Sequence, residues 1–543
     1  MKFIFVTWWV ISWIGKWIAA ASLGKLLVSA WYKVNAVKLD PYLQTDAGTM
    51  SPYEHGETFV TADWFETDLD LWHYERFLNV NITRNSSVTS GRIFSDIIAR
   101  EREWKYLGKT VQVVPHVTNY IKEIVKDAAM WYDVTLVEVW WTIWDIEWPH
   151  FIEAIRQMRK DFGVENTLYL HVVPLLYLKL TDELKTKPIQ HSVKELTRLW
   201  IQPDLILCRT EKPIPHEIKE KIALFCDIDV DSVVEWIDVA TIYDVVNKMA
   251  EQWVTQVIEK KLALPPLQPN LTKRNELLYR ITAPKHTVHI AIAGKYAEMP
   301  DAYLSVIEAC KHAGAYCDTK VCIHRFLAEE ITSIEQIKNF VEEQHIDAFI
   351  VPGGFGYRGV EWKILVAERC RTTQTPYLGL CLWLQIAVIE FARNVCGLAK
   401  ANSLEFDTHT PDPIIAFMPW QSEELAKWWT MRLWNYTAQM LPGCVITNIY
   451  QQVASHRCHR EERTTFITER HRHRYEVNPM YVDLLKHCGL VISGTDTQTH
   501  LVEYIEHGNH PYFVATQAHP EFTSRLEDPH PLFVGLVQAA MRR

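Results

Sequence analysis

The stretch Pro376-Tyr377-Leu378-Gly379-Leu380-Cys381-Leu382-Trp383-Leu384-Gln385 joins a short apolar run to an apolar helical pattern, with a cysteine at the change between them. A short apolar run of this kind predicts a buried strand. A nucleophile on a sharp strand-to-helix turn points out of the sheet, and the backbone N–H of the next residue, Leu382, points at a developing oxyanion. A lone cysteine after a strand is more often a core residue, so its partners decide the interpretation.

Candidate partners for this thiol lie in two other segments. His519-Pro520-Glu521 follows the predicted strand Tyr512–Thr516, and it offers an imidazole base with a carboxylate to hold the useful tautomer. Pro352-Gly353-Gly354-Phe355-Gly356 also follows a predicted strand, and its glycines allow a close backbone approach. A single His-Pro-Glu is usually a surface turn. The three segments together predict a hydrolytic site with Cys381, His519 and Glu521 as its catalytic set.

Strand and helix patterns alternate along both halves of the chain. The predicted strands are Phe3–Thr7, Val34–Leu39, Val134–Val139, Thr167–Val173 and Leu205–Cys208, then Val288–Ala293, Ala348–Val351, Tyr377–Leu380 and Tyr512–Thr516. Predicted helices include Ile152–Asp161 and Ser192–Leu199. This alternation favours an α/β protein with two doubly wound parallel sheets.

The proline-rich segment Leu264–Asn270 cannot continue a helix or a strand and marks a boundary between domains. We therefore expect one domain over residues 1–263, a linker over 264–285 and a second domain over 286–543. A chain of 543 residues is long enough for two or three such domains.

Composition narrows the class of protein. With 48% apolar and 22% charged residues, large-scale disorder is excluded. A net charge of −10 argues against a nucleic-acid partner, which would need clustered basic residues. The eleven cysteines include no CxxC pair, so neither a disulfide framework nor a zinc knuckle is indicated, and we expect a reducing cytoplasm.

The first residues raise the alternative of a secretory signal. Lys2 precedes an apolar run from Phe3 to Ile14, but Lys16 and Lys25 follow closely. No segment reaches the roughly 18 uncharged apolar residues of a membrane span. We expect no membrane partner.

The C-terminal motifs resemble the triad-type class I glutamine amidotransferases, whose elbow usually reads Gly-x-Cys-x-Gly. Trp383 stands at the position of the last glycine, where we expect an indole to clash or to widen the turn. The resemblance implies a flavodoxin-like fold. It also implies that glutamine is bound by Gly354, Leu382, Gln385, Glu405 and Arg474.

The N-terminal motifs are similar to those of the CTP synthases. They are Lys38-Leu39-Asp40-Pro41-Tyr42, Gly48-Thr49-Met50-Ser51-Pro52, the segment from Thr67 to Phe77, and Lys185-Thr186-Lys187-Pro188-Ile189-Gln190-His191-Ser192. Together with the glutaminase motifs, the resemblance covers nearly the whole chain. It implies a P-loop-like synthase domain similar to dethiobiotin synthetase. The implied reaction is ATP-dependent phosphorylation of O4 of UTP, followed by displacement of that phosphate by ammonia from glutamine.

The same resemblance implies the substrate-binding residues. ATP would contact Gly15, Lys16, Trp17, Lys38 and Asp70; UTP or CTP would contact Ser12, Asp145, Glu147, Lys185, Lys187, Gln190 and Lys221. Asp70 and Glu138, each expected at a strand end, are oxygen ligands suited to Mg²⁺. GTP is a candidate allosteric activator, and a homotetramer built as a dimer of dimers is the implied assembly.

Tryptophan replaces glycine at several of these positions. The chain holds 22 tryptophans, and its phosphate loop includes Trp8, Trp9 and Trp13, with only Gly15 left. Backbone N–H groups cradle phosphates, and each left-handed position costs a tryptophan about 1 kcal/mol or more. We therefore expect weakened nucleotide binding. A catalytically inactive scaffold or filament-forming homologue, or another glutamine-dependent amidoligase, remains as an alternative.

Overall fold

The computed structural model describes residues 1–8, 15–51, 56–140, 147–294, 302–327, 333–354, 359–417, 431–462 and 464–543. The chain divides into two compact units. The first contains Met1–Met50 and Phe65–Thr272, and the second contains Ser51–Trp64 and Lys273–Arg543.

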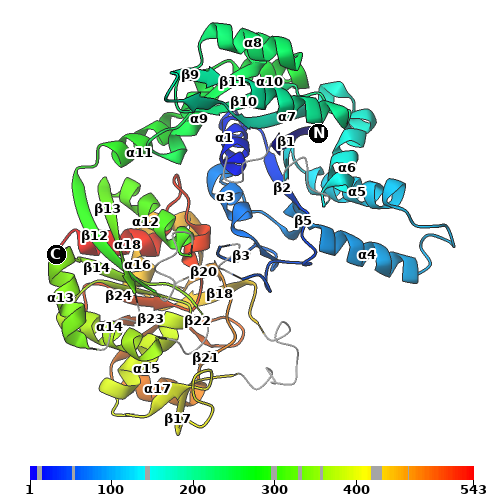
Figure 1. Cartoon of the computed structure of the whole chain (residues 1–543). Coiled ribbons are helices and arrows are strands. Elements are labelled where there is room, and N and C mark those ends of the chain that lie inside the picture. The colour runs from blue at the N-terminus through cyan, green and yellow to red at the C-terminus, as the bar shows by residue number, and fades with distance from the viewer. Residues whose placement is uncertain are drawn as a thin grey trace. The chain divides into compact units, whose positions relative to one another are not determined.

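A seven-stranded parallel sheet forms the centre of the first unit (Figure 1). Its order is β11-β10-β7-β1-β6-β2-β5, and every neighbouring pair is parallel. The strands are β1 (Lys2–Trp8), β2 (Val34–Asp40), β5 (Ser87–Thr89), β6 (Val134–Val139), β7 (Thr167–Pro174), β10 (Leu205–Thr210) and β11 (Val233–Ile237). Because β1 lies at the centre of the sheet, the described part of the N-terminal apolar run, Phe3–Trp8, belongs to the folded core.

Helices cover both faces of this sheet. They are α1 (Lys16–Ser29), α3 (Leu69–Leu78), α4 (Ser90–Arg102), α5 (Thr118–Ala129), α6 (Pro149–Phe162), α7 (Lys187–Arg198), α8 (His216–Cys226), α9 (Val245–Ala250) and α10 (Val254–Leu262). Phe3, Phe5 and Val137 pack with residues of α4, α5 and α6. A small hairpin, β8 (Leu176–Leu178) with β9 (Glu183–Lys185), precedes α7.

The second unit contains a ten-stranded mixed sheet (Figure 1). Its order is β13-β12-β14-β15-β24-β23-β22-β18-β20-β19. The parallel strands are β12 (His286–Gly294), β13 (Thr319–Leu327), β14 (Ala348–Val351), β15 (Tyr377–Leu380) and β24 (Phe513–Thr516). The antiparallel extension consists of β18 (Asn435–Met440), β19 (Cys458–Glu461), β20 (Thr464–Arg470), β22 (Leu490–Asp496) and β23 (Val502–His507). Numbered in chain order, the parallel strands run 2-1-3-4-5, which is the flavodoxin-like order.

Alternate residues of the parallel strands contribute to two hydrophobic cores, one on each face of the sheet. Val351, Tyr377 and Ala515 face a cluster with α13 (Ile334–Gln344), α14 (Val360–Thr373), α15 (Leu382–Asn394) and α17 (Pro479–His487). Ile350, Leu378 and Val514 face α12 (Leu304–Tyr316), α16 (Val445–Val453) and α18 (Pro531–Ala540). The predicted α/β class with doubly wound parallel sheets is confirmed, and the antiparallel extension is an addition that the sequence did not predict.

Three smaller features complete the chain. β16 (Ala401–Ser403), β17 (Asp412–Ala416) and β21 (Glu476–Val477) form a separate small sheet. The short strands β3 (Phe59–Val60) and β4 (Glu66–Thr67) precede α3. Residues 264–271 form neither helix nor strand, and α11 (Thr272–Thr282) lies within the range predicted as linker. Among the described residues, none of the helices has both the length and the apolar character required to cross a membrane.

Candidate active sites

The candidate nucleophile occupies a strained turn between β15 and α15. Cys381 has φ 56° and ψ −109°, an unusual conformation for a residue with a side chain. Its N–H donates to Thr516 O of the neighbouring strand β24 at 2.7 Å, and the helix begins at Leu382. The predicted strand-to-helix elbow is therefore present, and Leu382 N–H is one of the first amides of the helix, which have no partner within it.

A histidine–carboxylate pair follows β24. His519 Nδ1 lies 2.6 Å from Glu521 Oε1, and both side chains are buried. Burial alone would lower the pKa of the imidazole, but the neighbouring Cys381 and Glu521 outweigh it and raise the pKa of His519 to about 10. The imidazolium is therefore the favoured form at neutral pH, and its charge suits a thiolate partner.

Gly353 connects the two halves of this site. A Cβ at Gly353 would lie 2.8 Å from His519 Cε1 and 3.4 Å from Cys381 Cβ. Only a residue without a side chain fits at this distance from both groups. The backbone after β14, the histidine and the cysteine consequently meet at one point, as the order of the three motifs predicted.

The thiol makes a further contact that the sequence did not indicate. Cys381 Sγ donates to the carbonyl oxygen of Arg472 at 3.6 Å, and His519 Nε2 has no aligned hydrogen bond among the described residues. In this geometry the thiol hydrogen bond points at the loop after β20 and not at His519.

The residues expected to bind glutamine lie in different environments. Gln385 is buried, its amide nitrogen donates to Tyr475 O at 2.9 Å and to Gln517 Oε1 at 3.3 Å, and its oxygen has no partner among the described residues. Glu405 and Arg474 are half-buried, and the Arg474 guanidinium lies 5.2 Å from the Phe417 ring. Gly354 is also described, directly after Gly353, but Phe355 and Gly356 lie outside the described residues.

The expectation that Trp383 would distort the elbow is wrong. Trp383 is the second residue of α15, is 1% exposed, and packs on Trp362 with ring centroids 5.8 Å apart. The Lys363 ammonium lies 4.7 Å from the centroid of the Trp383 ring. The Trp383 side chain packs in the hydrophobic core between α14 and α15. It therefore does not occupy the turn at Cys381 between β15 and α15.

Part of the second unit comes from an early stretch of the chain, Ser51–Trp64. Phe59 meets Phe522 edge-on at 5.4 Å, and Phe522 stacks on His519 at 5.0 Å. Glu57 accepts a hydrogen bond from Ser305 N at 3.2 Å. Burial raises the pKa of Glu57 to about 8, and Glu521 is among the charges that act on it. Sequence reasoning missed this segment, because no local pattern assigns residues 51–64 to the later half.

In the first unit, Lys16 begins α1 directly after Gly15, as predicted. Gly15 has φ 84°, and a Cβ there would lie 2.6 Å from the Trp236 ring. Lys16 Nζ is 3.6 Å from Glu138 Oε1 near the end of β6. Burial lowers the pKa of Lys16 to about 8.

Lys38 is fully buried among three carboxylates. Its Nζ lies 3.1 Å from Asp40, 2.8 Å from Asp70, and in contact with Asp68. Burial would raise the pKa of Asp70, but the ammonium groups of Lys38 and Lys16 outweigh this and lower it to about 2. Burial raises the pKa of Asp40 to about 8. Asp70 was expected at a strand end, but it lies in the first turn of α3, whose N-cap is Asp68.

Indole rings cover these ammonium groups. The Trp8 and Trp140 rings lie 4.6 Å and 4.3 Å from Lys16 Nζ, and Trp140 is also 4.7 Å from Lys38 Nζ. Trp17 stacks on His73 with centroids 3.7 Å apart. The rings occupy space next to the cations where phosphate oxygens would need to approach.

The residues expected at the UTP site are only partly gathered. Lys187 starts α7, and its Nζ lies 5.5 Å from the Phe225 ring of α8, the helix that carries Lys221. Lys185 pairs with Glu183, and Gln190 is buried and donates to Thr186 Oγ1 at 3.3 Å. Glu147 is exposed. Ser12 and Asp145 lie outside the described residues, as do Trp9 and Trp13.

Comparisons with known proteins cover both units. Residues 2–264 match the family model for the CTP synthase N-terminus, and residues 298–539 match the class I glutamine amidotransferase model. The chain is 51% identical to the CTP synthase of Methanocaldococcus jannaschii over 100% of its length and 98% of the relative. The chain belongs to the CTP synthase family. The CTP synthase of Carboxydothermus hydrogenoformans is 49% identical over 100% of this chain and 99% of the relative.

Among solved structures, the glutaminase domain of Trypanosoma brucei CTPS with bound acivicin is 32% identical, covers 47% of this chain and 94% of that one, and has a TM-score of 0.42. Membership of the CTP synthase family means that the chain combines a synthase half with a class I amidotransferase half. The enzymes of this family are glutamine-dependent ligases that use ATP, UTP and glutamine.

Proposed function

We propose that Cys381, His519 and Glu521 hydrolyse glutamine by nucleophilic catalysis. The thiolate attacks the amide carbon, and the oxyanion forms near the N–H of Leu382 and the backbone at Gly354. His519 gives its proton to the leaving ammonia. Water then cleaves the thioester, with His519 as the base, and glutamate leaves. The observation that carries this proposal is the strained elbow at Cys381 with Gly353 wedged against His519.

We propose that the carboxylate Glu405 and the guanidinium Arg474 bind the ammonium and carboxylate of glutamine. Opposite charges suit these two groups of the substrate. The amide oxygen of Gln385 has no hydrogen-bond partner in the described part of the chain, and it offers an acceptor for the substrate amide. These roles rest on the half-buried positions of the two charged residues and on the class I resemblance.

We assign the transfer of phosphate to the first unit. Lys16 would contact the phosphates of ATP at the start of α1, and Lys38 would neutralise the transferring phosphoryl group. ATP phosphorylates O4 of UTP, ammonia then attacks C4, and inorganic phosphate leaves to give CTP. Residues 1–263 would act as the synthase half and residues 286–543 as the glutaminase half.

Asp70 and Glu138 fit a magnesium ion. Four carboxylates, those of Asp40, Asp68, Asp70 and Glu138, surround two ammonium groups, so the cluster carries excess negative charge when ionised. Glu138 Oε1 is buried without a hydrogen-bond donor among the described residues. Asp70 and Glu138 would hold Mg²⁺, which would supply positive charge beside the phosphates of ATP.

The remaining assignments rest on the family resemblance. Lys185, Lys187, Gln190 and Lys221, with Asp145 and Glu147, would bind UTP or CTP. GTP would activate glutamine hydrolysis, and four chains would assemble as a dimer of dimers. All eleven cysteines are free thiols, which supports a reducing cytoplasm as the working compartment.

The test is CTP formation from UTP and ATP with glutamine or ammonia as the nitrogen source. Cys381→Ser is expected to reduce glutamine-dependent CTP formation by roughly a thousandfold or more, because the nucleophile is removed. Ammonia-dependent CTP formation should be unchanged. Equal loss with both nitrogen sources would overturn the assignment, and Cys488→Ser, which changes a half-buried thiol directly after α17, is the matched control.

A further inference from the structure

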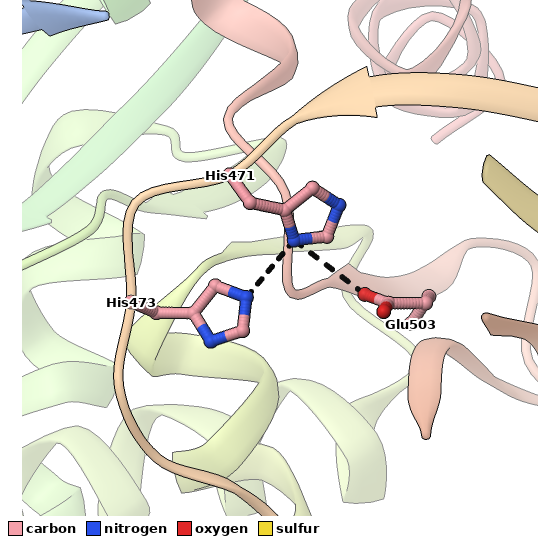
Figure 2. Close-up of side chains that lie close together, drawn as sticks. All are labelled: His471, His473 and Glu503. Atoms are coloured by element: carbon pink, nitrogen blue, oxygen red, sulfur yellow. Dashed lines mark hydrogen bonds and ion pairs between the residues drawn. The ribbon is translucent and has the colours of Figure 1, made fainter. Parts of the chain in front are cut away.

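Two histidine rings face a buried glutamate beside the loop that follows β20 (Figure 2). His471 Nδ1 lies 2.9 Å from His473 Nε2 and 3.6 Å from Glu503 Oε2 on β23. The three side chains are 3% exposed or less. One ligand atom from each residue lies within 4.8 Å of the other two.

The backbone fixes this loop before any ligand enters. His471 N–H donates to Trp434 O at 3.0 Å, and Arg432 and His473 exchange two backbone hydrogen bonds of 2.8 Å and 3.3 Å. The buried histidines alternate with Arg472 and Arg474, which are half-buried. In an extended segment alternate side chains point in opposite directions, so both rings are directed to the same side.

Neighbouring groups orient the candidate ligand atoms. His473 Nδ1 lies 3.3 Å from Tyr475 O and 3.5 Å from Glu476 Oε1, so that its proton is held there and the lone pair of Nε2 faces His471. Arg432 Nη1 lies 2.8 Å from Glu503 Oε1. Glu503 Oε2 has no hydrogen-bond donor among the described residues. Metal-binding histidines and carboxylates are commonly held in this way by a second layer of polar partners.

The charge around the cluster is unbalanced. Arg432 is in ion-pair contact with Glu476, Asp496 and Glu503, so three buried carboxylates share one guanidinium. Both imidazoles are uncharged when their nitrogens are available as ligands. Uncompensated charge in a buried position is costly, and a divalent cation beside these carboxylates would favour their ionised form.

We propose that His471, His473 and Glu503 bind one dication of the zinc type, with water in the fourth position. Two imidazole nitrogens and a carboxylate oxygen form a ligand set suited to this ion. Ligand atoms around a tetrahedral zinc lie about 3.3 Å apart, given bonds of about 2.0–2.1 Å. The contacts of 2.9 Å and 3.6 Å need only small shifts to reach that spacing.

The ion acts as a positioning element for the glutaminase. Arg472 lies between the two histidines, and its carbonyl oxygen accepts the hydrogen bond from Cys381. Arg474, proposed to bind glutamine, follows directly in the same loop. A metal that fixes both rings therefore fixes the carbonyl next to the nucleophile.

Metal stoichiometry tests the site directly. The full-length chain carrying Cys381→Ser, so that the nucleophile cannot chelate, is stripped, equilibrated with zinc, desalted and analysed for metal. One zinc per chain is expected, and it should be lost in His473→Gln and in Glu503→Gln. The control His324→Gln changes a second histidine pair, in which Nδ1 of His289 lies 2.8 Å from Nε2 of His324. Among the described residues this pair belongs to no three-ligand group, so the variant should retain the zinc.

Two further measurements do not depend on a folded variant. Cobalt(II) bound to the unmodified chain should give the visible absorption of a tetrahedral ion, and anomalous scattering from zinc-loaded crystals should place the ion between the rings. No retained metal, equal retention in all three histidine and glutamate variants, or an anomalous peak elsewhere overturns the proposal.

Activity separates the positioning role from the proposed function. After chelation, kcat/KM for glutamine should fall by about fivefold or more and recover on addition of zinc. Ammonia-dependent CTP formation should stay constant, so that failure of the synthase half is recognised separately. Zinc bound at the site with unchanged glutamine kinetics would overturn the positioning role.

Discussion

At the scale of single residues, burial and charge decide the protonation of the candidate catalytic groups. His519 is buried, and it nevertheless favours the charged form because a thiol and a carboxylate are its neighbours. Lys16 is nearly as buried, and its pKa moves the other way because desolvation outweighs the attraction of Glu138. The same low-polarity environment therefore stabilises one cation and destabilises the other.

The first prediction concerns the alkaline limit of glutamine hydrolysis. The pKa of His519 is raised to about 10 from an ordinary value of about 6.5. Its stabilising contribution is complete below about pH 6.5 and is lost as pH rises through 10, and kcat/KM for glutamine should decline there. Glu521→Gln removes a charge that raises this pKa, so the alkaline limb should move to lower pH. The exposed Glu461→Gln is the control, and an unmoved limb in Glu521→Gln would contradict the prediction.

The second prediction concerns the indoles on Lys16. Trp140→Gly, alone and combined with Trp8→Gly, should rehydrate the ammonium, raise its pKa toward 10.5 and open the approach to phosphate. We expect ATP to bind at least tenfold more tightly, about 1.4 kcal/mol. Isothermal titration with ATP at pH 7 and pH 9 measures this. Unchanged affinity in both variants, with thermal unfolding confirming the fold, would contradict the prediction that these indoles weaken ATP binding.

At the scale of elements, three helices end on a tryptophan in the left-handed conformation. Trp31, Trp104 and Trp200 have φ 70°, 60° and 63° and follow α1, α4 and α7. Each completes the same pair of hydrogen bonds, such as Trp31 N to Val28 O at 3.0 Å and Tyr32 N to Leu27 O at 3.1 Å. This is a Schellman ending, in which the left-handed position is usually glycine.

The third prediction follows from these helix endings. Trp31→Gly, Trp104→Gly and Trp200→Gly should each stabilise the first unit by about 1 kcal/mol, because glycine adopts positive φ without a steric penalty. The side chains are 75–86% exposed, so little packing is lost. Trp131→Gly is the matched control: it is 81% exposed and is absent from the positive-φ positions, so no gain is expected. Urea unfolding followed by circular dichroism measures all four, and a gain in Trp131→Gly equal to the others would contradict the explanation.

Local patterns predicted the elements that carry strong apolar runs. The bounds of β6, β14 and β15 agree with those expected, and the elbow at Cys381 follows from the abrupt end of β15. Pairings between distant segments could not be predicted in this way. The antiparallel strands β18, β20, β22 and β23 pair between segments that local patterns do not link. Asp70 belongs to α3 because Asp68 caps that helix.

In the candidate site too, the sequence predicted the motifs but not the contacts made by side-chain packing. The spacing of the motifs was enough to bring Cys381, His519 and Gly353 together. The contact of the thiol with Arg472 and the burial of Lys38 among carboxylates depend on side-chain packing, which leaves no periodic signal in the sequence.

At the scale of the whole molecule, an early segment helps to support the later catalytic centre. Phe59 packs on Phe522, which stacks on His519, and Val60 O accepts a hydrogen bond from Arg470 at 3.1 Å. The second unit therefore includes residues from the N-terminal part of the chain, Ser51–Trp64, which are synthesised before the rest of that unit.

The fourth prediction uses this support. Phe59→Ala should destabilise the second unit by about 3–5 kcal/mol and lower kcat/KM for glutamine, because the stack beneath His519 loses its partner. The KM for ATP in the ammonia-dependent reaction should be unchanged. Thermal unfolding and both assays measure this, with the exposed Tyr279→Ala as control. Equal effects on the glutamine and ammonia reactions would contradict a local role for Phe59.

The placement of residues 51–64 also limits how the chain can be dissected. A protease cut or a gene split between residues 264 and 285 would leave Glu57, Phe59 and Val60 on the N-terminal piece, although they belong to the unit that carries the nucleophile. In the excised C-terminal piece, Phe522 would lose its contact with Phe59 and would be uncovered next to His519. Supplying a synthetic peptide of residues 51–64 in trans, or grafting it ahead of Lys273, is the way to restore a self-sufficient ammonia-producing fragment.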